Sequence, residues 1–292
     1  MGNLKMKPLY YLYLLPAFLL FLVFFIVPFI QTFYFSLQDW DSIGKMSFIG
    51  ISNYLEMFRD EVFVASIGRV LKYALIQVVI QIILGLLFSA LLRGERKGNG
   101  FFRAVYFLPY IISSAAICVM FTVMYDNDIG LVNNLLRAVG LGSLTHIWLG
   151  EEATAFYATI AVPIWQGLGM YIVILLSGLQ GISEEYYDAA KIDGANAFQT
   201  FRAITVPMLW PIIQICIVLS VSGALKNFDY VYILTGGGPG SSTHVPATFM
   251  YDKTFVGMRY GYGSAIAVFI FMMGFIFTVV FKGIAGRKSI DD

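Results

Sequence analysis

The chain has 292 residues, of which 59% are hydrophobic and only 13% are charged, with a mean hydropathy of +0.76 and a formal net charge of +1. Soluble domains carry roughly 25% charged residues, so this composition excludes an ordinary soluble domain and indicates a polytopic membrane protein. The balanced charge, with no basic patch interleaved with aromatic residues, gives no support for nucleic-acid binding.

Long apolar runs predict the architecture. Each is close to the roughly 20 residues that a helix needs to cross the bilayer core, and lipid requires helices because it offers backbone groups no water to bond. A β-barrel would show short alternating segments instead. The first run is too long for a signal peptide and lacks a small-residue cleavage pattern, so no cleavable signal is expected. The six predicted spans are 10–35, 70–92, 104–124, 155–180, 211–234 and 262–281.

The basic residues are distributed unequally between the two sides of these spans. Of the 19 Lys and Arg residues, eleven lie on one side, five on the other and three at or within helices. Because cytoplasmic loops are enriched in Lys and Arg, the eleven predict a cytoplasmic side that holds both termini. The eleven are Lys5, Lys7, Arg93, Arg96, Lys97, Arg103, Lys191, Arg202, Lys282, Arg287 and Lys288; the five are Lys45, Arg59, Arg137, Lys253 and Arg259; the three are Arg69, Lys72 and Lys226.

The outer loops, 38–65 and 125–154, contain aromatic residues with Asp and Gly punctuation, which predicts short interfacial helices. His146 and His244 are isolated in outer loops, which favours surface residues over metal ligands. Cys118 and Cys216 lie inside apolar runs and are expected to be packed thiols, since two cysteines cannot form a metal site unaided. No internal repeat or linker divides the chain, so we expect a single all-α membrane domain, residues 1–292, with its core at about 66–285.

Between the fourth and fifth spans lies a polar, helix-forming segment at about 183–207. Ser183 is a suitable N-cap, and the acidic residues after it suit the positive end of a helix. Gly194 is placed to end the helix with a left-handed C-cap, and a second helix is expected to begin near Ala197 and lead to Pro207. Without further information, this segment could be an ordinary interfacial helix that only anchors the loop.

The spacing of this segment resembles the cytoplasmic EAA loop of permease subunits in binding-protein-dependent ABC importers. The family pattern is EAA, three residues, Gly, nine residues and Ile-x-Leu-Pro; here Asp188-Ala189-Ala190, Gly194 and 204–207 keep every interval, with Asp for Glu and Val206 for Leu. The resemblance implies a coupling helix that docks into a cleft of an ATPase subunit. Its implied coupling residues are Glu185, Asp188, Ala189, Ala190, Asp193, Gly194 and Pro207.

More of the chain resembles the maltose-type, carbohydrate-uptake branch of that family. The segments 98–110, 182–195, 228–240 and 261–265 carry this resemblance, which extends over about 10–285. It implies a compact six-span type I importer fold in a prokaryotic cytoplasmic (inner) membrane. It also implies a second homologous permease, two ATPase subunits, an extracytoplasmic solute-binding protein and a sugar as substrate. The chain itself would be non-catalytic and without a cofactor, since ATP and Mg would bind the ATPase subunits.

The glycine-rich run 236–240 invites interpretation as a phosphate cradle. No Gly-Lys-Ser/Thr follows it, no strand precedes it, and the predicted topology places it outside, away from ATP. A tight outer turn is therefore expected, for which glycine permits the necessary backbone angles.

Polar residues in the fourth and fifth spans are candidates for a substrate pathway, because polar groups at membrane depth usually face a cavity or a partner helix. Asn227 is one such residue, and alignment with the maltose-type permeases implies six more. Close packing of small residues between helices is the alternative interpretation. Lys226 and Asp229, three apart, are expected to form a structural ion pair rather than a proton relay. The seven pathway candidates are Gln166, Gly167, Met170, Ser220, Gly223, Ala224 and Asn227.

Other functions are less well supported by the residues. An ABC importer for glycerol phosphate would need several cations in the pocket, and only Lys226 is near; a polyamine importer is the other transport alternative. A membrane enzyme would need a constellation of His, paired carboxylates or a nucleophile at membrane depth, and none is visible. A secondary carrier often shows inverted repeats, and in such a carrier the polar helix at 184–193 would have no evident function.

Overall fold

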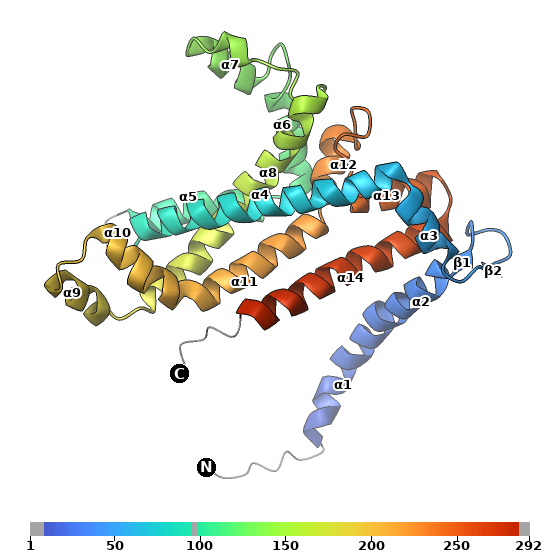
Figure 1. The fold of residues 1–292 in the computed structure, drawn as a ribbon, viewed down its shortest axis with the longest axis horizontal. Coiled ribbons are helices and arrows are strands. Elements are labelled where there is room, and N and C mark those ends of the chain that lie inside the picture. The colour runs from blue at the N-terminus through green and yellow to red at the C-terminus, as the bar shows by residue number, and fades with distance from the viewer. Residues whose placement is uncertain (1–8, 95–97, 286–292) are drawn as a thin grey trace. The chain divides into compact units, whose positions relative to one another are not determined.

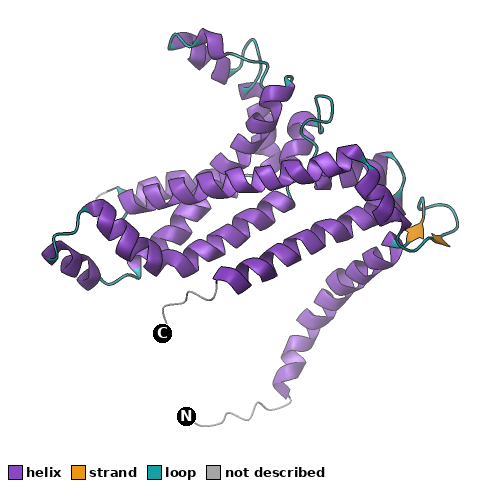
Figure 2. Cartoon of the chain, in the orientation of Figure 1, coloured by secondary structure: helices purple, strands orange, loops and turns teal. Residues whose placement is uncertain are grey.

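The computed structural model describes residues 9–94 and 98–285, and almost all of its regular structure is helical (Figures 1 and 2). The chain divides into two units, one formed by residues up to 60 together with 250–271, the other by 61–249 together with the residues from 272 onward. Six of the eleven residues that predict the cytoplasmic side, Lys5, Lys7, Arg96, Lys97, Arg287 and Lys288, lie outside the described residues. The orientation of the termini therefore stays a prediction.

The first unit begins with a long apolar helix. α1 (Leu9–Phe21), a π-helical turn (Leu22–Ile26) and α2 (Val27–Ser36) follow one another without a break. The stretch Tyr13–Ser36 is long and apolar enough to span a membrane, and none of its most apolar window is buried. Because only lipid or a partner helix can cover so much exposed apolar surface, the first predicted span is supported.

The rest of the same unit is held by a small sheet and a bidentate ion pair. β1 (Gln38–Asp39) pairs antiparallel with β2 (Ser47–Phe48), and α3 (Ser52–Arg59) follows. The buried amide of Asn53 donates to the carbonyls of Ser36 and Gln38, both at 2.9 Å. Both guanidinium NH groups of Arg259 reach Glu56, at 2.6 and 2.7 Å, and lower the pKa of that carboxyl. A π-helical turn (Asp252–Val256) precedes α14 (Tyr260–Ala285), whose residues belong to both units.

The second unit is a bundle in which α8 packs against both α4 and α5, and α11 packs against α4. Its apolar clusters fill the spaces between these helices, and the free thiols of Cys118 and Cys216 are buried in two of them, which confirms that both are packed. The helices are α4 (Glu61–Leu91), α5 (Asn99–Ile111), α6 (Ser114–Met124), α7 (Leu131–Ala138), α8 (Glu152–Gln180), α9 (Glu184–Ile192), α10 (Ala197–Thr200), α11 (Val206–Leu225) and α12 (Asp229–Thr235), with short turns at Gly142–Leu144 and Phe201–Thr205. The residues of α13 (Pro246–Tyr251) belong to both units.

The six predicted spans are confirmed in part. Among the described residues, five helical stretches are long and apolar enough to cross a membrane: Tyr13–Ser36, Glu61–Leu91, Glu152–Gln180, Ala197–Leu225 and Tyr260–Ala285. The predicted third span, 104–124, is not one helix, because α5 and α6 meet at an angle of 95°. A sixth span exists only if this bent pair counts as one.

The predicted fifth span, 211–234, has different limits. Its helical stretch begins at Ala197 and ends at Leu225, and α12 is a separate short helix that starts at Asp229. Lys226 and Asp229 are therefore not on one helical face, and the expected ion pair between them is not formed. Asp229 instead accepts a hydrogen bond of 2.6 Å from the hydroxyl of Ser114, at the start of α6.

Both long loops that the sequence predicts to be outer, 38–65 and 125–154, contain a short helix as predicted, α3 and α7. The two histidines are more enclosed than expected for surface residues, since both are half-buried. The ring of His146 lies 2.9 Å from Glu151 and packs on Trp148, and the ring of His244 lies 3.2 Å from the Thr248 hydroxyl. Their polar neighbours and aromatic contacts give them structural roles in these loops.

Two helices of the bundle, α5 and α8, approach each other closely at Gly169. A Cβ added there would lie 2.0 Å from the carbonyl oxygen of Tyr106 on α5. We therefore expect Gly169→Ala to destabilise the protein by about 1–3 kcal/mol, because a backbone cannot yield as a flexible side chain can. Thermal unfolding of the purified protein measures this. Gly68→Ala is the matched control: a Cβ there meets no atom within 4 Å, and the protein should be as stable as the wild type or slightly more so.

Candidate coupling loop and intramembrane polar site

The segment between α8 and α11 folds as its capping residues predict. The Ser183 hydroxyl accepts from the backbone N–H of Glu185 at 3.3 Å and begins α9. Gly194 has φ of +74°, and the N–H of Ala195 bonds to the carbonyl of Ala190 at 2.9 Å, which closes the helix end. Gly194 is thus the left-handed C-cap expected from the sequence. Because these caps depend on residues a few positions apart, the sequence alone predicts them.

The return half of this loop is capped in the same local way. Asn196 and Gln199 exchange hydrogen bonds of 2.8 and 2.9 Å in a capping box that begins α10. A π-helical turn (Phe201–Thr205) then leads into α11, where Pro207 occupies the first turn. Figure 1 shows α9 and α10 as a protrusion at the end of the bundle where α5 begins.

The predicted coupling residues present an exposed surface with one exception. Glu185, Asp188, Ala189, Asp193 and Gly194 are exposed and Pro207 is half-buried, whereas Ala190 is only 7% exposed. Of the two alanines, Ala189 alone therefore offers a small exposed side chain to a partner, because adjacent residues on a helix point about 100° apart. Three large apolar side chains are also exposed on this loop: Tyr186, Ile192 and Phe198.

Asp188, which replaces the Glu of the EAA pattern, forms an ion pair within α9. Its carboxylate lies 2.9 Å from the ammonium of Lys191, and this contact raises the pKa of the lysine. Both side chains are more than half exposed, so water screens the pair and it contributes little to stability. Asp188 is consequently free to exchange this partner for another.

Contacts that the sequence did not reveal fasten α9 to the bundle. Arg93, just after α4, makes an ion pair of 2.7 Å with Glu184, and its guanidinium carbon lies 3.8 Å from the centre of the Tyr187 ring. The Tyr187 hydroxyl lies 3.3 Å from that of Thr205, at the end of the return segment. α9 is thereby linked both to α4 and to the start of α11. In the sequence, Arg93 is only one of several basic residues near the ends of predicted spans.

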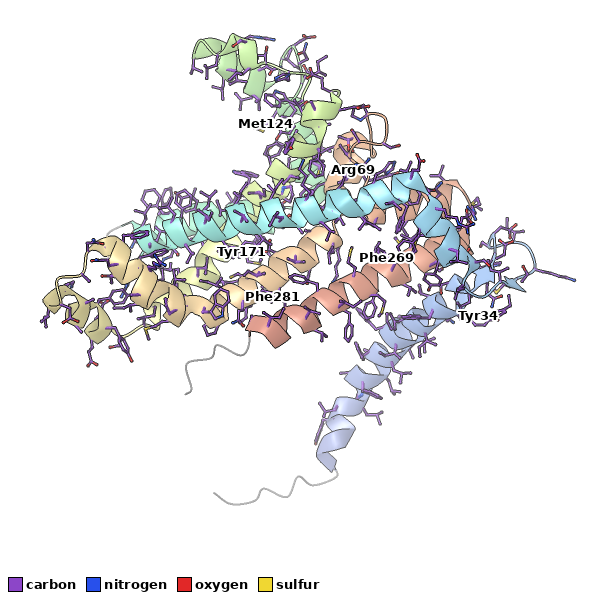
Figure 3. The ribbon with its side chains drawn as sticks, viewed as in Figure 1. Tyr34, Arg69, Met124, Tyr171, Phe269 and Phe281 are labelled. Carbon is purple, nitrogen blue, oxygen red and sulfur yellow. The ribbon has the colours of Figure 1, made fainter. Side chains whose placement is uncertain are left out.

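A row of polar residues, spaced by four or eight positions along α4, forms the second candidate site. Tyr73, Gln77, Gln81 and Ser89 are all buried, although this helix is one of the most apolar in the chain. In Figure 3, Arg69, four residues before Tyr73, lies on the same helix toward its amino-terminal end. A spacing of four places these side chains on one side of the helix.

Gln81 connects this row to two of the predicted pathway residues. Its amide accepts from the Ser220 hydroxyl of α11 at 2.8 Å and donates to the carbonyl of Pro163 in α8 at 3.3 Å. A Cβ added to Gly167 would lie 2.8 Å from the Gln81 nitrogen. Gly167 therefore leaves the space that the Gln81 amide occupies.

One turn along, Gln77 and Asn227 carry unsatisfied acceptors. Asn227 donates through its amide nitrogen to the Tyr73 hydroxyl, and a Cβ added to Gly223 would lie 3.9 Å from the Gln77 nitrogen. The side-chain oxygens of Gln77 and Asn227 are both buried and accept no hydrogen bond in the described part of the chain. Because a buried acceptor without a donor costs about 1–3 kcal/mol, these two oxygens call for a donor from outside the chain.

Gln166 is a residue of α8, and its side chain reaches the bend between α5 and α6. Its nitrogen donates at 2.8 Å to the carbonyl of Ile112, which the break leaves without a helical partner, and its oxygen accepts at 2.7 Å from the Tyr230 hydroxyl. The amide thus stabilises a broken helix by satisfying its free carbonyl. The last two candidates, Met170 and Ala224, pack in apolar clusters.

The structure therefore unites four of the seven pathway candidates, Gly167, Ser220, Gly223 and Asn227, around α4. Sequence reasoning missed the residues that unite them, Tyr73, Gln77 and Gln81. Their spacing of four in an apolar helix was an available signal.

Comparison with known proteins identifies the family. Residues 81–289 match the family described as binding-protein-dependent transport system inner membrane component. A probable ABC transporter permease protein of Bacillus subtilis is 40% identical over 90% of this chain and 91% of its own length. The trehalose/maltose transport system permease protein of Thermococcus litoralis is 35% identical, over 93% and 91%.

The fold agrees with that family. A chain of a bacterial ABC transporter involved in the import of the acidic polysaccharide alginate superposes with a TM-score of 0.85 at 23% identity, covering 99% of this chain and 98% of that one. The likeness supports the predicted type I importer permease fold. ABC permeases are integral membrane subunits without catalytic activity. The chain therefore belongs to the family of binding-protein-dependent transport system inner membrane components, the permease subunits of ABC transporters.

Proposed function

We propose that this chain is a permease subunit of an ATP-driven sugar importer and supplies half of the translocation pathway, the other half coming from a second, homologous permease. The observation that carries the proposal is the set of similar proteins, which are named as trehalose/maltose, multiple sugar and diacetylchitobiose permeases and are 30–35% identical over 89–93% of this chain. The polar, uncharged character of the α4 site agrees with a sugar, whose hydroxyl groups donate to amide oxygens.

In this proposal the α9–α10 loop docks into a cleft of an ATPase subunit. Ala189 leaves room for the wall of the cleft, while Tyr186, Ile192 and Phe198 supply apolar contact area. Closure of the ATPase dimer displaces α9. Since α9 is fastened to Arg93 after α4 and to Thr205 before α11, the displacement reaches two spans together. The ATPase thereby biases a two-state arrangement of the spans.

The remaining partners follow from the same proposal. A solute-binding protein delivers the sugar at the opposite face; a similar importer is known in complex with an alginate pentasaccharide-bound periplasmic protein. The α9 side faces the cytoplasm of a prokaryotic cell, with the complex in the cytoplasmic membrane. ATP and Mg bind the two ATPase subunits, and this chain supplies neither a catalytic group nor a cofactor site.

Reconstitution of the four-subunit importer in proteoliposomes tests this function. ATP hydrolysis should rise when the binding protein is added with its sugar, and labelled sugar should accumulate only with ATP present. The substrate class is tested separately, by measuring which solutes raise the unfolding temperature of the cognate binding protein. A response to glycerol phosphate or a polyamine, and to no sugar, would replace the sugar assignment while leaving the importer assignment intact.

A further inference from the structure

A cavity of about 590 Å³ lies where α4 ends, α5 begins and α8 passes into α9. It is distinct from the α4 polar row, and none of the predicted coupling or pathway residues lines it. Its polar lining includes the side chains of Arg93, Asn99, Arg103, Ser183 and Glu184. Among the described residues that line it, two cations and one carboxylate give a net charge of +1. The cavity therefore favours an anion.

The two arginines differ in how far their hydrogen-bonding groups are used. Arg93 is already occupied by Glu184 and the Tyr187 ring. The Nε of Arg103, by contrast, is buried and has no acceptor in the stretches 9–94 and 98–285. A guanidinium nitrogen is buried favourably only when an acceptor meets it, and the planar donor fork suits phosphate oxygens. Arg103 thus lacks the partner that the cavity has room to hold.

The start of α5 adds backbone donors to the same cavity. Its N-cap, Gly98, offers no side chain, and the first helical bond runs from the N–H of Phe102 to the carbonyl of Gly98 at 3.1 Å. The N–H groups of Asn99 and Gly100 are therefore unused by the helix, and a Cβ at Gly100 would meet no atom within 4 Å. N–H groups that the helix itself does not bond attract anions at a helix start, and here they lie beside two arginines.

The surface next to the cavity is apolar and exposed. Phe101 is 70% exposed, Phe102 50% and Val105 46% on α5, and Leu91 is 58% exposed at the end of α4. A soluble anion would leave these side chains uncovered, whereas the acyl chains of a lipid would cover them. Basic pockets at the membrane-proximal ends of spans are known to take lipid headgroups.

We propose that this cavity binds the phosphate of an anionic phospholipid, with Arg103 and the start of α5 as its donors and the acyl chains over the exposed face of α5. Bound there, the lipid lies against Arg93 and Glu184, the ion pair that fastens α9 to the bundle. The proposed function would place this lipid in the cytoplasmic leaflet. The leaflet therefore rests on the proposed function, but the binding itself does not.

Native mass spectrometry of the purified full chain in detergent tests the site without an ATPase or a transport assay. The protein is titrated with phosphatidylglycerol, with phosphatidylcholine of the same acyl chains and with inorganic phosphate. Arg103→Gln should weaken phosphatidylglycerol binding about fivefold, the change that corresponds to roughly 1 kcal/mol per cation. Arg103→Lys should retain most of the affinity. Lys282→Gln, which removes one exposed charge from the end of α14, should bind as the wild type does.

Because the buried Nε of Arg103 meets no acceptor among the described residues, substitution breaks no hydrogen bond of that atom and should leave the thermal unfolding midpoint unchanged, which separates loss of a ligand from loss of the fold. Equal weakening in the Arg103→Gln and Lys282→Gln proteins would show a diffuse charge effect and overturn the site. So would phosphatidylcholine binding as tightly as phosphatidylglycerol. Inorganic phosphate binding as tightly as the lipid would replace the lipid assignment with a soluble anion.

Discussion

Replacing Ala189 with arginine should abolish ATP-driven uptake while leaving the protein folded. Ala189 is exposed at the centre of α9, and arginine is a good helix former, so α9 itself tolerates the change. A guanidinium in a close-fitting cleft would be buried without a partner, a cost of about 2–5 kcal/mol, which weakens ATPase binding at least tenfold. Co-purification of the ATPase subunits and binding-protein-stimulated ATP hydrolysis measure the effect.

Ala153→Arg is the matched control for this experiment. Ala153 is also exposed and lies in the first turn of α8, at the other end of that helix from α9. The same charge is added there, but ATPase association should stay at the wild-type level. If the Ala189→Arg protein assembled and transported normally, α9 would not be the docking element. Equal loss of association in both variants would point to a general defect of expression or insertion.

The second large effect is expected at Gln81. Gln81→Leu removes both hydrogen bonds that join α4 to Pro163 and Ser220, and it leaves the buried Ser220 hydroxyl without its acceptor. We expect a loss of about 1–3 kcal/mol in stability. We also expect uptake per assembled complex to fall at least tenfold, because leucine interrupts the polar row along which a sugar would exchange hydrogen bonds. Uptake in proteoliposomes, normalised to assembled complex, measures the second effect.

Ser89→Ala tests whether position on this row matters by itself. Ser89 is equally buried, but its hydroxyl donates only to the carbonyl of Leu86, three residues earlier on the same helix. Uptake should stay within about twofold of the wild type, since the change removes one hydrogen bond inside α4 and none that joins α4 to another helix. If Gln81→Leu lowered the unfolding temperature but transported normally per complex, the α4 row would be packing alone. ATPase association should be intact in both variants.

The elements that the sequence predicted well are governed by neighbours along the chain. The apolar runs located the spans, since a bilayer selects continuous hydrophobic helices. Ser183, Gly194 and the 196–199 capping box fix the ends of α9 and α10 through bonds across two to five residues. The family resemblance includes this locally determined segment, and the comparison with known proteins confirmed the family over most of the chain.

The elements that the sequence mispredicted depend on distant contacts. The bend at residue 112 interrupts an apolar run that would otherwise form one helix, and the amide that satisfies its free carbonyl comes from Gln166, 54 positions later. The Asp229 carboxylate finds Ser114 instead of Lys226 because α11 ends before it.

The amino-acid sequence by itself determined that this is a membrane-spanning helical protein with a capped polar loop, because hydrophobic length and capping are local properties. Only the tertiary structure decided which side chains meet. It turned Ala190 inward and left Ala189 exposed, brought Gln81 to Ser220 across 139 positions, and enclosed Arg93 and Arg103 in one cavity. The packing of α4, α5, α8 and α11 creates these contacts, since each joins residues on different helices whose partners no local pattern specifies.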